Sequence, residues 1–571
     1  SAVWTSGNVA IQGLRSRQSP ATAAEAAEHE VPILPSAPRV DADRNRMHDA
    51  LVEKLTRHGF LLGMLLAPLL FLVGLRLLPA FDLEVFALTF HMVLMTVIAT
   101  CSLVVAAMVA RASTMVRQPS LVLMAAACLT VGLLLLGHGL TTPNTLGQPA
   151  NVWGGRFSYM ALTLFSILLG SASAFGSKPA LQPLGRHAGP VLVSVTTPLV
   201  ILVTAVSISP TILWGDAPIA QEAILRSVAL IGSIAILIPV SWSYWRRFRL
   251  SLDIVHASLA IAAAMNAIAF VSMHFGEPWR LSWWDYHGCL LAGFAGVAYA
   301  VISRQRSADT AAAVLENAFE DDPMALIATN YPEALRTLVD AIEVKDAYTS
   351  GHSARTAALA VSIGVRMGLD AGALRTLAQG AYLHDIGKLG IPDEILSKPG
   401  KLDENERSII NTHPQIGCDI AAAHRVLEPC LPIIRHHHER LDGNGYPDGL
   451  SGRDIPLLAR ITAVADVWDA LVTDRAYRPG WEPSRALDHR VDSAGTHLDP
   501  RAVAVLLDIA AESGVTVGNT PVDPSALAEA TRDCHEAGAT SRVGTELVRP
   551  VLNRLVRTGT PADGPKATGS G

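Results

Sequence analysis

Between residues 60 and 303, long apolar stretches alternate with short polar loops. Each stretch holds about twenty apolar residues, the length that a helix needs to cross the hydrocarbon core of a bilayer. Charged residues are nearly absent from their interiors, and Arg76 and Arg226 lie near the ends, where long side chains reach the interface. We therefore predict eight membrane-spanning helices: Phe60–Pro79, Phe86–Ala110, Leu121–Leu140, Phe157–Phe175, Pro190–Leu213, Ala223–Trp245, Ile254–Phe275 and Tyr286–Ser303.

The hydrophobic pattern changes in residues 333–514. There, Leu335, Leu338, Val339 and Ile342 recur at the i, i+3, i+4 and i+7 spacing of one helix face, and later segments repeat this spacing. Strand-like alternation is almost absent. The fold class that we predict is therefore all-α, with a polytopic transmembrane bundle followed by an all-α domain.

Composition predicts where the remaining segments of the chain begin and end. Residues 1–45 are rich in Ala, Ser, Pro and Gln and contain no long apolar run, which predicts a disordered tail before the transmembrane region, 46–303. An Ala-rich, charged stretch, 304–332, is expected to form a connector helix of the kind that pairs across a homodimer. The all-α domain, 333–514, is followed by an extension, 515–571, which we expect to be partly disordered.

Basic residues fall in alternate loops of the transmembrane region, and acidic residues dominate the loops between them. This asymmetry follows the positive-inside rule. It predicts a multi-pass protein of the cytoplasmic (inner) membrane, with both termini and the all-α domain in the cytoplasm. The basic loop residues are Arg111, Arg117, Lys178, Arg186, Arg246, Arg247, Arg249, Arg304 and Arg306.

The composition supports a chain with a membrane part. Of 571 residues, 50% are hydrophobic and 17% are charged, which is too apolar for an ordinary soluble protein. The net charge of −6 argues against binding to a nucleic acid polymer. The six cysteines form no close C-x-x-C pair, so neither a zinc ribbon nor a disulfide scaffold is indicated.

Five histidines lie in or near the predicted spans: His91, His138, His256, His274 and His287. Ionisable groups inside a membrane are candidates for ligands of haem or copper, or for proton sensing. Hydrogen bonding between helices is the alternative role. Their spacing does not distinguish the two.

The all-α domain contains an unusual density of histidines and carboxylates. Several helices that each donate one or two such side chains can form a two-metal site. Imidazole with carboxylate, and without thiolate, suits iron, manganese, zinc or cobalt. Two such ions activate water for in-line attack on phosphorus, so the pattern indicates hydrolysis of a phosphate ester. The candidate ligands are His352, His384, Asp385, His413, His437, His438 and Asp466.

Three basic residues are candidates for binding the phosphate. Lys388 follows Asp385 by three residues, which predicts the same helix face for both. Arg475 and Arg478 are also three apart and follow the helix that carries Asp466. We expect His436 to be solvated or to support the ligands rather than to bind metal.

Two blocks, His384-Asp385-Ile386-Gly387-Lys388 and His437 to Pro447, resemble the signatures of the HD-GYP family, a branch of the HD phosphohydrolases. The resemblance covers residues 333–514. It extends to Gly351-His352-Ser353, to the residues around Asp466 and to Asp474-Arg475-Ala476-Tyr477-Arg478.

The resemblance implies a phosphodiesterase that hydrolyses the bacterial second messenger cyclic di-GMP to pGpG and GMP. It also implies the seven candidate ligands, two divalent ions (iron or manganese), and Lys388, Arg475 and Arg478 as phosphate contacts, with Asp385 and Lys388 as catalytic residues. The Gly-Tyr-Pro loop would shape the site and contact a partner, such as a GGDEF-type signalling protein. This loop contains Asp442, Gly443, Gly445, Tyr446 and Pro447.

One position departs from some family members, which carry a glutamate that helps to hold a third metal. Here that position is Tyr348, and Glu343 is a poor substitute, so we predict two metal ions. The leading hypothesis is a membrane-anchored phosphodiesterase regulated by a signal sensed in the transmembrane region. The alternatives are a cyclic di-GMP sensor or effector without turnover, and a hydrolase of another cyclic dinucleotide such as cGAMP.

Overall fold

The computed structural model shows helices and three isolated β-bridges, with no strand, in the part of the chain that it describes. The all-α fold class is thus confirmed. The predicted tail, 1–45, and the extension, 515–571, lie outside the described residues. The described residues are 58–142, 153–176, 178–208, 219–304, 315, 318–320, 322–328, 331, 333–346, 351–398, 400–474 and 479–512.

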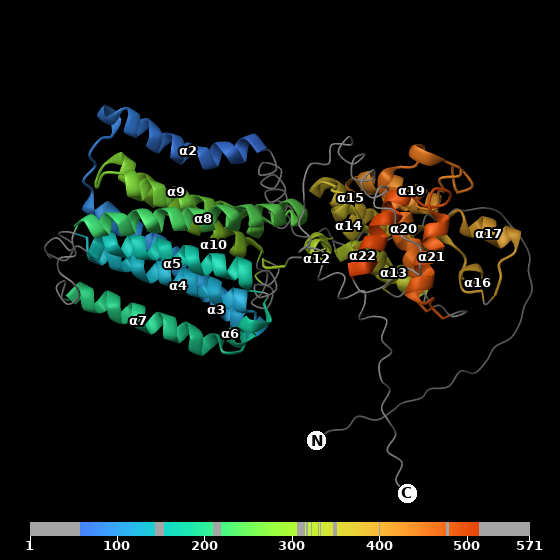
Figure 1. Ribbon diagram of the computed structural model, residues 1–571, viewed down its shortest axis with the longest axis horizontal. Helices are drawn as coiled ribbons and strands as arrows, with labels where there is room; N and C mark the ends of the chain where they lie inside the picture. The colour runs from blue at the N-terminus through green and yellow to red at the C-terminus, as the bar shows by residue number, and fades with distance from the viewer. Residues whose placement is uncertain are drawn as a thin grey trace, which may run out of the picture. The chain divides into compact units, whose positions relative to one another are not determined.

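The N-terminal part consists of long apolar helices (Figure 1). Seven helices, from α3 to α10 with the short α6 excepted, are long and apolar enough to cross a membrane. The first predicted span coincides with α2, whose described apolar segment, Leu65–Leu77, is shorter. The elements are α2 (His58–Leu77), η1 (Pro79–Phe81), α3 (Leu88–Val116), α4 (Pro119–Leu140), α5 (Trp153–Phe175), η3 (Pro179–Leu181), α6 (Gln182–Arg186), α7 (Ala188–Ile208), α8 (Ile219–Ser251), α9 (Ile254–Phe275) and α10 (Leu281–Arg304).

Six of these helices pack in a closed ring. In order around the ring, α3, α4, α5, α8, α9 and α10 each contact the next, and α10 contacts α3. Helix α7 packs against α4 from outside the ring, and α2 packs against α9 and α10. Helix α4 is the most enclosed of the seven candidate spans, because α3, α5 and α7 all cover it.

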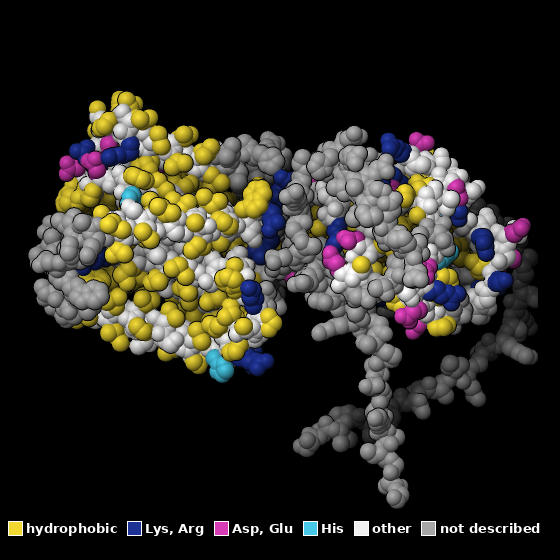
Figure 2. Space-filling model, viewed as in Figure 1, with side chains coloured by type: hydrophobic (Ala, Val, Ile, Leu, Met, Phe, Trp, Pro, Cys, Tyr) yellow, Lys and Arg dark blue, Asp and Glu magenta, His cyan; other side chains and the backbone are white. Residues whose placement is uncertain are grey.

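The outer surface of this bundle is apolar (Figure 2). Leu70, Ile201, Ile231 and Trp242 are each more than 60% exposed. An apolar surface of this extent is costly in water but is solvated by lipid tails. The seven long apolar helices and this surface together indicate a membrane-spanning region.

The loops at one end of the bundle are joined by polar contacts. Asp82, before α3, accepts hydrogen bonds from the backbone nitrogen and the hydroxyl of Ser282 at 2.9 and 2.7 Å. Arg76, at the end of α2, forms an ion pair with Glu277 at 2.8 Å. These contacts fix the starts of α3 and α10 beside each other.

The C-terminal part is made of shorter helices. Its elements are α12 (Pro323–Ala328), α13 (Glu333–Lys345), α14 (His352–Arg366), α15 (Ala371–Leu383), η5 (Ile386–Gly390), α16 (Asp393–Leu396), α17 (Glu404–Ile410), α18 (His413–Ala422), η6 (Arg425–Cys430), α19 (Leu431–His436), η7 (Gly452–Asp454), α20 (Leu457–Val472), α21 (Pro483–Ser493) and α22 (Pro500–Glu512).

Two apolar cores support the histidine-bearing segments of this part. One core joins α14, α15, α20 and α22, and the other joins α13, η5, α18 and α19. Leu383 and Ile386, which flank the His384–Asp385 pair, are fully buried in the second core. Val464 and Ala465, beside Asp466, are fully buried in the first core. The chemistry-bearing residues are thus anchored on both sides by apolar packing.

Candidate metal centre

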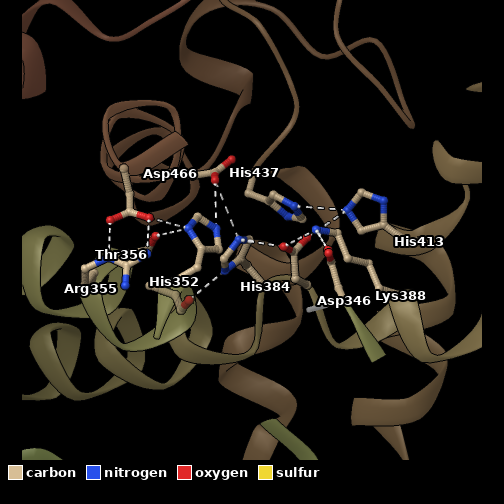
Figure 3. A network of polar contacts seen from close by, with 12 residues as sticks. Asp346, His352, Arg355, Thr356, His384, Lys388, His413, His437 and Asp466 are labelled. Atoms are coloured by element: carbon tan, nitrogen blue, oxygen red, sulfur yellow. Dashed lines mark hydrogen bonds and ion pairs between the residues drawn. The ribbon is translucent and has the colours of Figure 1, made fainter. Parts of the chain in front are cut away.

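The structure brings all seven sequence-predicted ligands together in two adjoining clusters. Figure 3 shows His352, His384, His413, His437 and Asp466 of this set. Within each cluster the potential ligand atoms all lie within 4.8 Å of one another. The first cluster contains Asp385, His413, His437 and His438, and the second contains His352, His384 and Asp466. We call them the first and second clusters below.

Helix ends orient three of the histidines. His384, His413 and His437 each hydrogen-bond through Nδ1 to the backbone carbonyl three residues earlier, at 2.7, 2.7 and 2.8 Å. These carbonyls lie at the ends of α15, α17 and α19, where the helix supplies no amide partner. With Nδ1 as the donor, Nε2 keeps its lone pair and is available to a metal ion.

His352 is oriented by a carboxylate instead. Its Nδ1 donates to Asp469 Oδ2 at 2.7 Å, and Arg355 binds the same carboxylate through Nε and Nη2 at 2.6 and 3.0 Å. Its Nε2 faces Asp466 Oδ1 at 3.2 Å. A carboxylate behind a histidine fixes the ring orientation and raises its basicity as a ligand.

Asp385 lies between the two clusters. Its Oδ2 is 3.4 Å from His384 Nε2, and its Oδ1 is 3.4 Å from His413 Nε2. One carboxylate therefore presents one oxygen to each cluster. This is the arrangement that a carboxylate needs to bridge two metal ions.

The electrostatics favour metal-binding protonation states in the first cluster. Burial and the neighbouring histidines hold the pKa of His437 well below its usual value and lower the pKa of His438 to about 3. Both rings are therefore neutral at physiological pH, as metal ligands must be. Burial alone would raise the pKa of Asp385, but Lys388, His384 and His413 hold it well below its usual value.

His352 differs from the other histidines. Burial lowers its pKa, but the hydrogen bonds to Asp466 and Asp469 outweigh that effect and raise the pKa to about 9. A metal ion and a proton would compete for Nε2 at neutral pH.

One buried atom indicates that the site fits a metal ion. His384 Nε2 is enclosed and has no hydrogen-bond partner among the described residues. Two carboxylate oxygens lie near it, Asp385 Oδ2 at 3.4 Å and Asp466 Oδ1 at 3.9 Å. A cation between these atoms would satisfy a lone pair that is otherwise costly to bury. The donor set is imidazole and carboxylate, which fits a divalent transition-metal ion.

Lys388 lies on the same face as Asp385, as its spacing predicted. Its Nζ is 2.8 Å from Asp385 Oδ2 and 3.1 Å from Asp346 Oδ2. Burial lowers the pKa of the ammonium, but these two carboxylates outweigh burial and raise it above its usual value. Lys388 is therefore a fixed positive charge at the edge of the first cluster.

The Gly-Tyr-Pro loop, residues 442–447, forms a wall of the first cluster. The Tyr446 ring stacks on His438 with 4.8 Å between ring centroids. A Cβ on Gly445 would lie 2.4 Å from the Arg440 backbone nitrogen, so only glycine fits. Asp442 pairs with Arg440 at 2.6 Å and accepts from the backbone nitrogen of Asn444 at 3.0 Å, which shapes the turn.

Glu439 supports this loop rather than either cluster. Its two carboxylate oxygens accept from the backbone nitrogens of Asp448 and Leu450 at 2.7 and 3.1 Å. His436 lies beside Glu439 and Asp448 and outside both clusters. The structure thus separates His436 from its two neighbours His437 and His438.

Asp346 and Asp469, which support Lys388 and His352, were not identified from the sequence. Asp469 follows Asp466 by three residues on α20, and that spacing is a signal that could have found it. No comparable signal marks Asp346, which meets Lys388 from a distant point in the chain. Arg475, Arg478 and Tyr348 lie outside the described residues, so their predicted roles stay predictions.

Glu343 also has a structural role. Its Oε2 accepts a hydrogen bond from the backbone nitrogen of Gly351 at 2.8 Å, immediately before His352. Gly351 adopts φ of +68°, the left-handed region that favours glycine, at the start of α14.

The part of the chain that carries this centre matches a known domain model. Residues 336–502 match the model of the HD domain. The chain is 43% identical over 177 residues to the cyclic di-GMP phosphodiesterase response regulator RpfG of Xanthomonas campestris. It is 37% identical over 218 residues to the cyclic di-GMP phosphodiesterase PA4108 of Pseudomonas aeruginosa, and 36% identical over 178 residues to the 3'3'-cGAMP-specific phosphodiesterase 2 of Vibrio cholerae.

These matches cover part of each protein. They span 31%, 38% and 31% of this chain and 47%, 52% and 34% of the three relatives, in the same order. The residues matched by the domain model include all seven residues of the two clusters. Residues 336–502 thus match the HD domain, and part of the chain is similar to proteins named as cyclic di-GMP phosphodiesterases.

Proposed function

We propose that the chain is a membrane-anchored, metal-dependent phosphodiesterase that hydrolyses cyclic di-GMP to pGpG and GMP. The observation that carries the proposal is the position of Asp385, whose two oxygens face His384 and His413 in different clusters. Such an arrangement suits two divalent ions, iron or manganese, held a few ångströms apart. The relatives named as cyclic di-GMP phosphodiesterases support the choice of substrate.

The metal ions would be held by the seven residues of the two clusters. When bound, two such ions activate water for in-line attack on phosphorus and neutralise charge on the leaving oxygen. The protein's own contribution is to fix the ligands. Helix-end carbonyls and Asp469 hold the imidazole rings, so the centre is organised before the substrate arrives.

Lys388 would position the scissile phosphate. Its ammonium already contacts two carboxylates, and it retains donor capacity for a phosphate oxygen. Tyr446, stacked on His438, would cover the side of the site where a nucleotide base or ribose must lie. Arg475 and Arg478 remain candidates for a second phosphate contact.

A second substrate has a specific observation in its favour. Three relatives that are 36–38% identical to this chain are named 3'3'-cGAMP-specific phosphodiesterases. A site that holds a dinucleotide through its phosphates and metal ions does not by itself distinguish guanine from adenine. We therefore include cGAMP as the alternative substrate.

The test is turnover by the full chain purified in detergent and loaded anaerobically with Fe(II) or Mn(II). Cyclic di-GMP and 3'3'-cGAMP are supplied separately, and the linear dinucleotides and mononucleotides are separated chromatographically. The proposal expects pGpG and then GMP from cyclic di-GMP. Faster turnover of cGAMP would favour the alternative substrate. Binding of both nucleotides without product, with either metal, would replace the enzyme with a sensor.

The membrane anchor and its regulatory role belong to the same proposal. The seven long apolar helices support an anchor in a membrane. The basic residues of alternate loops favour the cytoplasmic membrane with the HD domain in the cytoplasm, and both termini lie on that side when α2 is counted as an eighth span. Resistance of the chain to alkaline carbonate extraction would support integration into the bilayer, and release into the supernatant would contradict it. A homodimer and a GGDEF-type partner at the Gly-Tyr-Pro loop are further expectations of the family resemblance.

A further inference from the structure

Three of the five histidines that the sequence places in or near the predicted spans meet at one point. His91 lies in the first turn of α3, His138 in the last turn of α4 and His287 near the start of α10. These helices are neighbours in the ring, because α3 contacts both α4 and α10 (Figure 1). The other two histidines lie apart, with His256 bonded to Ser251 and His274 to Tyr159.

The rings of His138 and His287 both face one atom, Nε2 of His91. His91 Nε2 lies 3.1 Å from His287 Nε2 and 3.2 Å from His138 Nε2. His91 and His287 are 0% exposed and His138 is 6% exposed. Three imidazole nitrogens therefore share one buried point, and each ring comes from a different helix.

The orientation of His138 is fixed by its other nitrogen. Its Nδ1 lies 2.7 Å from the Gly154 carbonyl oxygen at the start of α5 and must donate to it. Nε2 of this neutral ring therefore carries a lone pair directed at His91. Tyr286 approaches the same nitrogen with its hydroxyl at 3.2 Å.

Protons satisfy this arrangement only when the Tyr286 hydroxyl donates to His138 Nε2 and His91 Nε2 donates to His287 Nε2. His91 Nε2 faces two other imidazole nitrogens and can supply at most one hydrogen between them. If His91 Nε2 is instead an acceptor, it directs its lone pair at that of His138. A cation at the common point would accept all three lone pairs at once.

We propose that His91, His138 and His287 bind one d¹⁰ transition-metal ion, copper(I) or zinc(II). Metal–imidazole bonds of about 2.0–2.1 Å in a tetrahedral or trigonal site separate the nitrogens by roughly 3.3–3.6 Å. The two nitrogen–nitrogen distances of 3.1 and 3.2 Å are close to that separation. Neutral ligands in an enclosed site suit an ion of low charge, which is a reason to include copper(I).

The same distances leave no room for a haem between His91 and either of the other two rings. Two axial imidazoles on opposite sides of one iron atom would place their nitrogens about 4 Å apart, with the macrocycle between them. The observed 3.1 and 3.2 Å leave no room for a ring. The site therefore takes a bare ion.

Three tryptophans cover the site from the loop side. The centroids of Trp279, Trp283 and Trp284 lie 5.6, 5.2 and 5.8 Å from that of His91. All three tryptophans are partly buried. They lie between the buried histidines and the outside of the bundle, at the loop that joins α9 to α10. An ion bound there would join α3, α4 and α10.

The test is the metal content of the full chain in detergent, after removal of weakly bound ions and titration with copper(I) or zinc(II). We compare the wild type with His91→Gln and His287→Gln, and use His274→Gln as the matched control inside the same bundle. Because the HD domain is unchanged in all four proteins, the metal that it binds contributes equally to each total and does not affect the differences between them. The wild type and the control are expected to retain one more equivalent than either cluster variant. Equal content in all four would overturn the proposal.

A second measurement needs no variant. The structure of the wild-type chain loaded with each metal is examined by anomalous scattering at the copper and zinc edges. A peak about 2 Å from all three Nε2 atoms is expected, and the edge at which it appears identifies the ion. No peak there with either metal, while the HD centre is occupied, would also overturn the proposal without affecting the phosphodiesterase assignment.

Discussion

Asp469 offers a sharp test of the second cluster, because it touches no predicted substrate or metal position. Its Oδ2 accepts from His352 Nδ1 at 2.7 Å, and the side chain of Asp469 is 7% exposed. Asp469→Asn preserves the size of the side chain. It removes the negative charge that fixes the proton on Nδ1 of His352 and that pairs with Arg355.

The expected magnitude follows from the role of this contact. Loss of a carboxylate behind a metal-binding histidine lowers metal affinity or activity by about 10- to 100-fold. That range corresponds to about 1.4–2.7 kcal/mol. We therefore expect the metal concentration for half-maximal activity to rise by this factor, with partial recovery of turnover at high metal concentration.

The assay is turnover of cyclic di-GMP as a function of Mn(II) concentration. Asp499→Asn is the matched control, since Asp499 is a 2%-exposed carboxylate paired with Arg460 and Arg501 and lies outside both clusters. Both variants lose a buried ion pair and some stability. Only Asp469→Asn should change the metal requirement. An unchanged metal requirement for Asp469→Asn, or an equal change in both variants, would refute the role assigned to Asp469.

Two other substitutions test neighbouring parts of the centre. Lys388→Met should lower kcat/KM by at least about tenfold, because a charge-assisted hydrogen bond to phosphate contributes roughly 1.5–3 kcal/mol. The control, Lys345→Met, removes a nearby lysine outside both clusters and should leave kcat/KM unchanged. Equal losses of kcat/KM in the two variants would contradict the phosphate role of Lys388. Gly387→Ala places a Cβ 1.8 Å from the His413 carbonyl oxygen, so we expect a loss of about 3 kcal/mol or more in unfolding free energy, measured by chemical denaturation of the chain in detergent. Gly390→Ala is its control, since the added Cβ meets only the Ile416 side chain, and equal stability of the two variants would contradict the packing account.

Most of the fold could be predicted from hydrophobic spacing. Seven of the eight predicted spans coincide with helices that are long and apolar enough to cross a membrane. The remaining one, in α2, has a shorter described apolar segment, Leu65–Leu77. The closed ring was beyond sequence reasoning, because pairing of α10 with α3 depends on contacts far apart in the chain.

The candidate ligands could be predicted because their residue types are chemically distinctive. The structure brings together all seven, although their blocks lie as far apart as His352 and Asp466. The supporting residues are harder to find. Asp346 is one carboxylate among many in the sequence, and only the fold shows that it meets Lys388.

The intramembrane histidines show the same limit. Five lay in or near apolar helices, and spacing along the chain did not separate ligands from helix contacts. The structure separates them by geometry. The Nε2 atoms of His138 and His287 both lie within 3.2 Å of His91 Nε2, whereas His274 is hydrogen-bonded to Tyr159.

The most direct test of the central claim, that Asp385 joins the two clusters into one hydrolytic centre, is turnover of cyclic di-GMP by Asp385→Ala. The measurement is made on the full chain at saturating Mn(II), with thermal unfolding as a check that the variant is folded. We predict that turnover is abolished and that at least one of the two metal ions is lost from the centre. Turnover at the wild-type rate by the folded variant would contradict the two-metal account.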